Sequence, residues 1–187
     1  QRPVAGGQAE LYGQTGREGG LMPITRPPVK PLDTLELLGV KVKADTSRYL
    51  PVPPHPRQKE FLDLTALEAF YGGAAGGGKT AALLMAALQY VHVPGYAALL
   101  IRRNFPDLYK PGALIPMSKQ WLLLTDASWS AQRQEWTFPS GAKLAFGYLE
   151  RDDDAYHFQG SELQFCGFDE LGQWPSDWSY RFLFSRL

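Results

Sequence analysis

The feature that most constrains this chain is a glycine-rich loop at residues 73–80, which reads GAAGGGKT. It matches the pattern G-x-x-x-x-G-K-[ST], in which a loop leads from a strand into a helix. Glycines let backbone N–H groups approach phosphate oxygens closely, and a helix directs the positive end of its dipole at an anion. Residues 69–71 are apolar and predict a short buried strand before the loop. The chain therefore contains a predicted strand–loop–helix unit for binding a nucleoside triphosphate.

Each position of the loop has an expected task. Lys79 is expected to contact the β- and γ-phosphates, and Thr80 is expected to bind Mg²⁺ through its hydroxyl. A flexible glycine-rich loop without a ligand does not explain Lys-Thr at the start of a helix, so we expect ATP and Mg²⁺ as ligands. The residues expected to hold the nucleotide are Gly73, Ala74, Ala75, Gly76, Gly77, Gly78, Lys79 and Thr80.

Two adjacent carboxylates follow a second apolar run. Residues 163–168 have the length of a strand and end at Asp169 and Glu170. Ligands bind at the carboxyl ends of strands in open α/β sheets. We expect Asp169 to hold the metal, and Glu170 to orient and deprotonate the attacking water. The more acidic run at residues 152–154 lacks a strand in the right position before it and predicts a solvated loop.

The chain divides into two parts near residue 56. Residues 1–55 are rich in glycine and proline and predict an arm or linker that is poorly structured or docked on the core. Residues 56–187 alternate helical and strand patterns, which predicts an α/β domain with a mostly parallel sheet flanked by helices and an inserted β-hairpin. The expected elements are helices at 58–69 and 80–92, strands at 69–71, 97–101 and 163–168, and hairpin strands at 135–138 and 143–148.

Composition excludes several classes of protein. The 187 residues carry 19 basic and 19 acidic side chains, so a wholly basic nucleic-acid clamp is not indicated. The single cysteine, Cys166, cannot form an internal disulfide, and this favours a reducing compartment. No apolar run approaches the ~20 residues of a membrane helix, so we expect no membrane partner.

Four stretches, taken in order, resemble the ATPase domain of the large terminase subunits of tailed phages. The loop alone is shared by many families, and the ordered combination makes the resemblance specific. It covers the chain from about residue 53 to the end. The stretches are PRQKEF at 56–61, the glycine loop at 72–80, LIRRNF at 100–105, and FQGSE leading to FDEL at 158–171.

The resemblance implies a P-loop NTPase fold of the additional-strand, glutamate-base class. It implies that Gln58 contacts adenine, and that Arg102 or Arg103 is an arginine finger that acts within the chain or on a neighbouring subunit. With Lys79 and Glu170 these arginines form the expected catalytic set. Some terminases carry an arginine inside the glycine loop, and this loop has none. The charge-neutralising role therefore falls to an arginine elsewhere: Arg102, Arg103, Arg181 or Arg186.

The resemblance also implies a function and partners. ATP hydrolysis would power translocation of double-stranded DNA into a procapsid, with the portal protein and the small terminase subunit as partners. The family implies a homo-oligomeric ring, a pentamer, in the cytoplasm of the infected host and transiently at the portal vertex. We expect residues 56–187 to be an incomplete ATPase domain without the family's nuclease domain. A helicase- or recombinase-type ATPase, and a nucleotide-binding assembly module without turnover, remain alternatives.

Overall fold

The computed structural model describes residues 43–45, 47–74 and 76–187. Most of the predicted arm, residues 1–42, lies outside the described residues, as do Thr46 and Ala75. The end of the arm docks on the core at Tyr49, which is 6% exposed. Its ring packs edge-on against Phe138 at 5.0 Å, and its hydroxyl donates a hydrogen bond to Asp126 at 3.0 Å.

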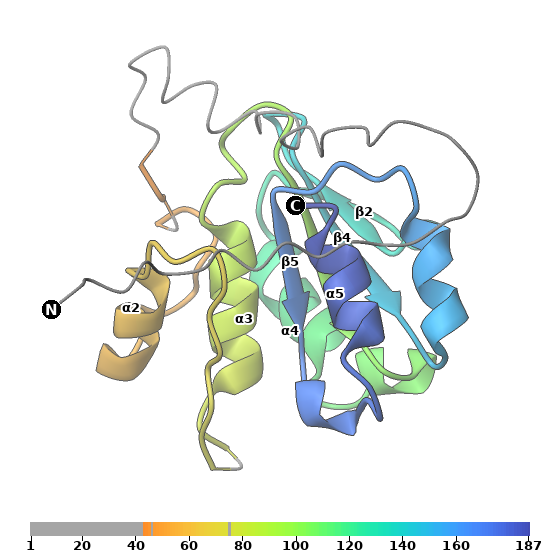
Figure 1. Cartoon of the computed structure of the whole chain (residues 1–187). Coiled ribbons are helices and arrows are strands. Elements are labelled where there is room, and N and C mark those ends of the chain that lie inside the picture. The colour runs from red at the N-terminus through yellow and green to blue at the C-terminus, as the bar shows by residue number, and fades with distance from the viewer. Residues whose placement is uncertain (1–42, 46, 75) are drawn as a thin grey trace, which may run out of the picture.

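A five-stranded mixed sheet, in the order β2-β3-β4-β1-β5, forms the centre of the molecule (Figure 1). β1 runs parallel to both β4 and β5, while β2, β3 and β4 are antiparallel neighbours. The predicted hairpin is confirmed as β3 and β4. The sheet is mixed because this hairpin is antiparallel, and the unpredicted three-residue strand β2 adds a second antiparallel pair beside β3. The bounds are β1 Ala97–Arg102, β2 Ser128–Ser130, β3 Glu135–Thr137, β4 Lys143–Tyr148 and β5 Phe165–Phe168.

Helices cover both faces of the sheet. Helices α3 and α4 lie on one face, and α5 and the 3₁₀ helix η2 lie on the other (Figure 1). In the described residues, none of the helices is long and apolar enough to cross a membrane. The helical bounds are α2 Pro56–Leu62, η1 Phe105–Leu108, α3 Lys79–Leu88, α4 Leu114–Leu122, η2 Asp152–Phe158, η3 Leu171–Gln173 and α5 Trp178–Phe184.

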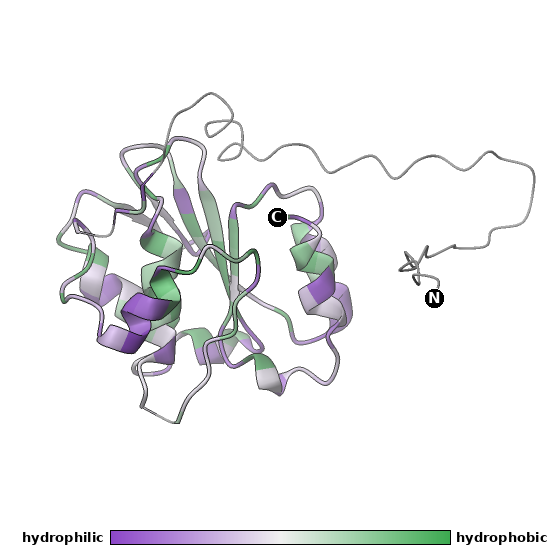
Figure 2. Cartoon of the chain, turned by 60° about the vertical axis from the view of Figure 1, so that its left-hand side comes forward, coloured by the Kyte–Doolittle hydropathy of each residue, from purple (hydrophilic) through white to green (hydrophobic). Residues whose placement is uncertain are grey.

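Strand β1 explains why two layers of helices are needed. Side chains alternate between the two faces of a strand, and residues 97–101 of β1 are all apolar, so both of its faces must be covered. Ala98 and Leu100 pack in the cluster on the α3 side, and Leu99 and Ile101 pack in the cluster on the α5 side. Each is at most 1% exposed. Figure 2 shows hydrophobic residues along the strands between the helical layers.

Two predictions about the region before the glycine loop are wrong. Helix α2 ends at Leu62, seven residues earlier than expected. Residues 69–71 are irregular, and Phe70 is 69% exposed. A strand needs the backbone of a partner within hydrogen-bonding distance. Within the described residues β5 pairs with β1 alone, and a groove separates its other edge from this segment.

Candidate functional site

The glycine loop leads directly into α3, whose first residue is Lys79. Gly78 caps the helix in the left-handed conformation, with φ +70°, and Gly76 has φ +78°. Side chains with a Cβ rarely adopt such angles, so the local path of the chain depends on glycine here. The Nζ of Lys79 donates hydrogen bonds to the carbonyl oxygens of Gly73 and Ala74, both at 3.1 Å. The Lys79 side chain thus bridges the two ends of the loop. Ala75, which is also predicted to contact the nucleotide, lies outside the described residues.

The first acidic residue lies beside the start of α3. Asp169 directly follows β5, and its backbone N–H donates to the carbonyl oxygen of Ile101 at 2.9 Å. The residue is 3% exposed. The hydroxyl of Thr80 lies 3.1 Å from Oδ2 and 3.3 Å from Oδ1 of Asp169. The structure therefore brings together the two side chains predicted to hold the metal, which stand 89 residues apart in the sequence.

Glu170 has a conformation unlike that of its neighbours. It is exposed, and its backbone is left-handed, with φ +60° and ψ +47°. For a residue with a side chain this conformation costs ~1–2 kcal/mol. Such strain is concentrated at functional sites. The turn separates β5 from η3, so Glu170 lies just beyond the carboxyl end of the strand.

Both candidate finger arginines are engaged with the protein. The guanidinium of Arg102, at the end of β1, lies against Asp169, with Nη2 2.7 Å and Nε 2.9 Å from Oδ2. The Nη1 of Arg103 donates a hydrogen bond to the carbonyl oxygen of Gln173. The parallel pairing of β1 with β5 brings Arg102 and Asp169 to the same end of the sheet. The finger role stays a prediction.

The Gln58 side chain, which was expected to contact adenine, is buried and hydrogen-bonded within the protein. It is 4% exposed. Its Oε1 accepts a hydrogen bond from the backbone N–H of His55 at 2.9 Å, and its Nε2 donates to the carbonyl oxygen of Gly78 at 3.0 Å. The two ends of the amide therefore cap α2 and tie it to the glycine loop. Adenine contact stays a prediction, and these two bonds compete with it.

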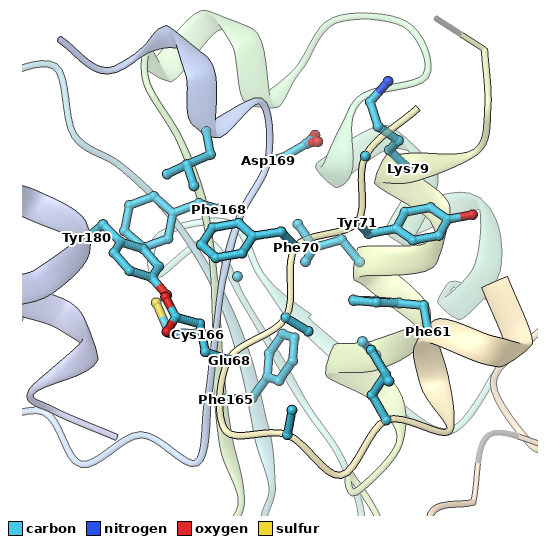
Figure 3. Close-up of a pocket in the computed structure, with 18 of the residues that line it drawn as sticks. Phe61, Glu68, Phe70, Tyr71, Lys79, Phe165, Cys166, Phe168, Asp169 and Tyr180 are labelled. Carbon is cyan, nitrogen blue, oxygen red and sulfur yellow. The ribbon is translucent and has the colours of Figure 1, made fainter. Parts of the chain in front are cut away.

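A pocket of about 460 Å³ extends from this constellation along the free edge of β5. Lys79 and Asp169 lie at the same end of it, and the aromatic rings line the remainder (Figure 3). The hydroxyl of Tyr180, on α5, donates a hydrogen bond to Glu68 on the opposite wall. Glu68 and Tyr180 were not predicted from the sequence, because no local pattern relates positions 112 residues apart.

Cys166 also lines the pocket. Burial raises the pKa of its thiol to about 12, so the thiol stays protonated near neutral pH. A reactive cysteine is a thiolate with a lowered pKa. Cys166 is therefore a wall residue of the pocket, without the properties of a nucleophile.

The donor set suits Mg²⁺ bound together with phosphates. Mg²⁺ takes one or two protein oxygens and completes its shell with water and phosphate. Thr80 and Asp169 supply two such oxygen-bearing side chains in contact with each other. Within the described residues there is no cluster of three or more acidic, histidine or cysteine side chains that would hold a metal without further ligands. The residues present therefore fit a metal that arrives with a nucleotide.

Comparisons with known proteins point to one family. A search of curated proteins gave no match, and a search of solved structures gave none either. The family model described as the terminase large subunit, T4likevirus-type, N-terminal, matches residues 70–179, which is more than half of the chain. The match begins just before the glycine loop and includes Asp169 and Glu170. This chain therefore belongs to the T4likevirus-type family of terminase large subunits, and its role is in packaging phage DNA.

Proposed function

We propose that this chain binds ATP with Mg²⁺ at the glycine loop and hydrolyses it, and that hydrolysis drives double-stranded DNA into a procapsid. One observation carries the proposal: Thr80, at the start of α3, lies 3.1 Å from Asp169, at the end of β5. This contact joins the phosphate loop to the acidic strand end, which is the arrangement that phosphoryl transfer requires. The proposed fold is accordingly that of a P-loop NTPase.

Each residue would have a separate task. Lys79 would exchange its two carbonyl partners in the loop for the β- and γ-phosphates. Thr80 and Asp169 would hold Mg²⁺, which neutralises phosphate charge when it is bound. Glu170, held apart from the sheet by its left-handed turn, would accept the proton of the attacking water. The adjacent carboxylates would thus divide metal holding from proton transfer.

The proposal extends to the assembly. Membership of the terminase large subunits supports contacts with double-stranded DNA, with the portal protein and with the small terminase subunit. We propose that the motor works as a homo-oligomeric ring, a pentamer, in the cytoplasm of the infected host and at the portal vertex. Arg102 or Arg103 remains the proposed source of positive charge at the γ-phosphate.

The test compares wild type with Lys79→Ala and Glu170→Gln in two assays, nucleotide binding by calorimetry and phosphate release with and without double-stranded DNA. Lys79→Ala should lose nucleotide binding and turnover together. Glu170→Gln should bind ATP normally and turn over ~10²–10⁴-fold more slowly, the usual cost of losing a general base. Lys143→Gln is the matched control, because Lys143 pairs with Glu135 and lies level with the start of β1, away from the end of β1 where the site lies. Unchanged binding and turnover in Lys79→Ala would exclude the proposed site.

DNA packaging needs its own assay. Procapsids incubated with the wild-type large subunit, its partner proteins and ATP should protect DNA from nuclease, and the Glu170→Gln variant should not support this protection. ATP hydrolysis accompanied by strand separation and no protected DNA would favour the helicase alternative. Binding of ATP without phosphate release under any condition would favour the assembly module.

A further inference from the structure

The ion pair between Arg102 and Asp169 is the most buried one in the described part of the chain. The Arg102 side chain is 14% exposed and that of Asp169 is 3% exposed. Two guanidinium nitrogens, Nη2 and Nε, share the single oxygen Oδ2 at 2.7 and 2.9 Å. Lys79, the other cation of the site, is directed at the loop carbonyls of Gly73 and Ala74 instead. Arg102 is thus the cation that balances Asp169 in this conformation.

Such a carboxylate cannot be left alone without a large cost. A buried charge is costly unless it is paired and hydrogen-bonded. Asp169 has two partners, the guanidinium of Arg102 and the hydroxyl of Thr80. Thr80 and Asp169 are also the side chains that fit Mg²⁺. The carboxylate that would hold the metal is therefore already neutralised by a resident cation.

We propose that Arg102 is a positioning residue, the built-in counter-ion of Asp169, which neutralises this carboxylate while no metal–nucleotide is bound and shares that role with Mg²⁺ when it arrives. The inference rests on the proposed nucleotide site. It differs from a finger role, in which the guanidinium acts on the γ-phosphate and matters mainly in the transition state. Arg102 instead acts on ground-state binding, through Asp169.

The charge of Arg102 should affect nucleotide binding differently with and without magnesium. In the wild type, Arg102 screens ATP from the negative charge of Asp169 even when magnesium is absent. In Arg102→Gln that charge is unbalanced, so metal-free ATP is repelled more strongly. Mg²⁺ restores the balance, because it carries positive charge to the same carboxylate. Loss of Arg102 should therefore weaken metal-free binding more than magnesium-dependent binding.

The measurement is the affinity of the 187-residue chain for a non-hydrolysable ATP analogue, with excess Mg²⁺ and with a chelator. The dissociation constant in chelator divided by that in Mg²⁺ is the magnesium factor. Arg102→Gln should raise this factor about tenfold, equivalent to ~1.4 kcal/mol. Arg102→Lys keeps the positive charge, and its factor should stay within about threefold of the wild-type value, ~0.7 kcal/mol. Arg48→Gln, which removes an exposed pair with Asp126, is the control and should leave the factor unchanged.

Several outcomes overturn the inference. If both affinities fall in parallel and the factor is constant, Arg102 has only a structural role. If both affinities are unchanged and only turnover falls, Arg102 is a finger. If Arg102→Gln does not fold, as judged by circular dichroism, Arg102→Lys decides, and a tenfold change in its factor contradicts the proposal. If wild type binds no nucleotide, the proposed function fails, and this inference fails with it.

Discussion

The side-chain amide of Gln58 donates a hydrogen bond to the carbonyl oxygen of Gly78, at 3.0 Å, and so ties α2 to the start of α3. The contact is close on both sides. A Cβ added to Gly78 would lie 2.7 Å from Nε2 of Gln58, which is shorter than atoms of this kind approach. One buried amide therefore ties the glycine loop to α2, and a side chain at Gly78 would be strained by φ and would displace this amide.

This relationship predicts separable effects at Gln58. Gln58→Glu retains the acceptor for the His55 N–H and replaces the donor to Gly78 with a carboxylate oxygen, whereas Gln58→Ala removes both bonds. We expect Gln58→Ala to lower the free energy of unfolding by ~1–3 kcal/mol. Both variants should weaken nucleotide binding, because the loop loses its external tie. Chemical denaturation and calorimetry measure the two effects. Normal nucleotide binding by Gln58→Glu would show that the tie to Gly78 is dispensable.

Replacing Glu170 should affect the stability of the fold and ATP turnover in different ways. The backbone at position 170 is left-handed, with φ +60°. Glycine adopts this conformation without steric cost, so Glu170→Gly relieves strain that Glu170→Ala retains. We expect Glu170→Gly to be about 1 kcal/mol more stable than Glu170→Ala, measured by thermal or chemical unfolding. Both should lose ATP turnover, since neither carries a carboxylate. Equal stability of the two variants would mean that the turn relaxes without cost.

A side chain at Gly167, on β5, is predicted to overpack the core. An added Cβ would lie 2.7 Å from Cδ1 of Leu83 and 2.9 Å from Cδ2 of Leu100, between α3 and β1. Overpacking of this kind costs ~1–3 kcal/mol. Gly167→Ala should therefore be destabilised by that amount, and adding Leu83→Ala should recover part of the loss relative to the sum of the single variants. Strictly additive losses in chemical denaturation would contradict the contact.

The stability that the Asp107 carboxyl contributes to the fold should depend on pH. Hydrogen bonds from Lys110, at 2.5 Å, and from Asn104, at 3.1 Å, lower the pKa of its carboxyl. Because the folded-state pKa is below the unfolded value of ~3.9, its contribution is present above that value and is lost as pH falls through the folded pKa. Asp107→Asn should cost about 1 kcal/mol near pH 7, since Lys110 is exposed and partly screened.

The measurement for Asp107 is denaturation across the acid range. The difference between wild type and Asp107→Asn should shrink below about pH 4. Asp177→Asn, which removes an exposed pair with Arg181, is the matched control and should cost less at every pH. A difference that grows as the pH falls would have the wrong sign and would refute the assignment.

The features that the sequence determined by itself are those that depend on neighbouring residues in the chain. The glycines with Lys79 and Thr80 predict a phosphate loop because few other functions need those residue types at that spacing. The apolar run at residues 97–101 and the alternating runs at 135–138 and 143–148 correctly predicted β1 and the hairpin, because the alternation of side chains along a strand is a local property. The family resemblance inferred from four stretches agrees with the matched family.

The tertiary structure decided which of those residues meet. Residues 69–71 have the composition of a strand, yet they are irregular because a groove separates them from the free edge of β5. Gln58 and Arg102 looked like free side chains for a nucleotide, and in the fold one is committed to Gly78 and the other to Asp169. Such pairings depend on the parallel register of β1 with β5 and on the position of α2. These are long-range relationships that no local pattern encodes, whereas the pattern that predicts a phosphate loop is local and can be read from the sequence alone.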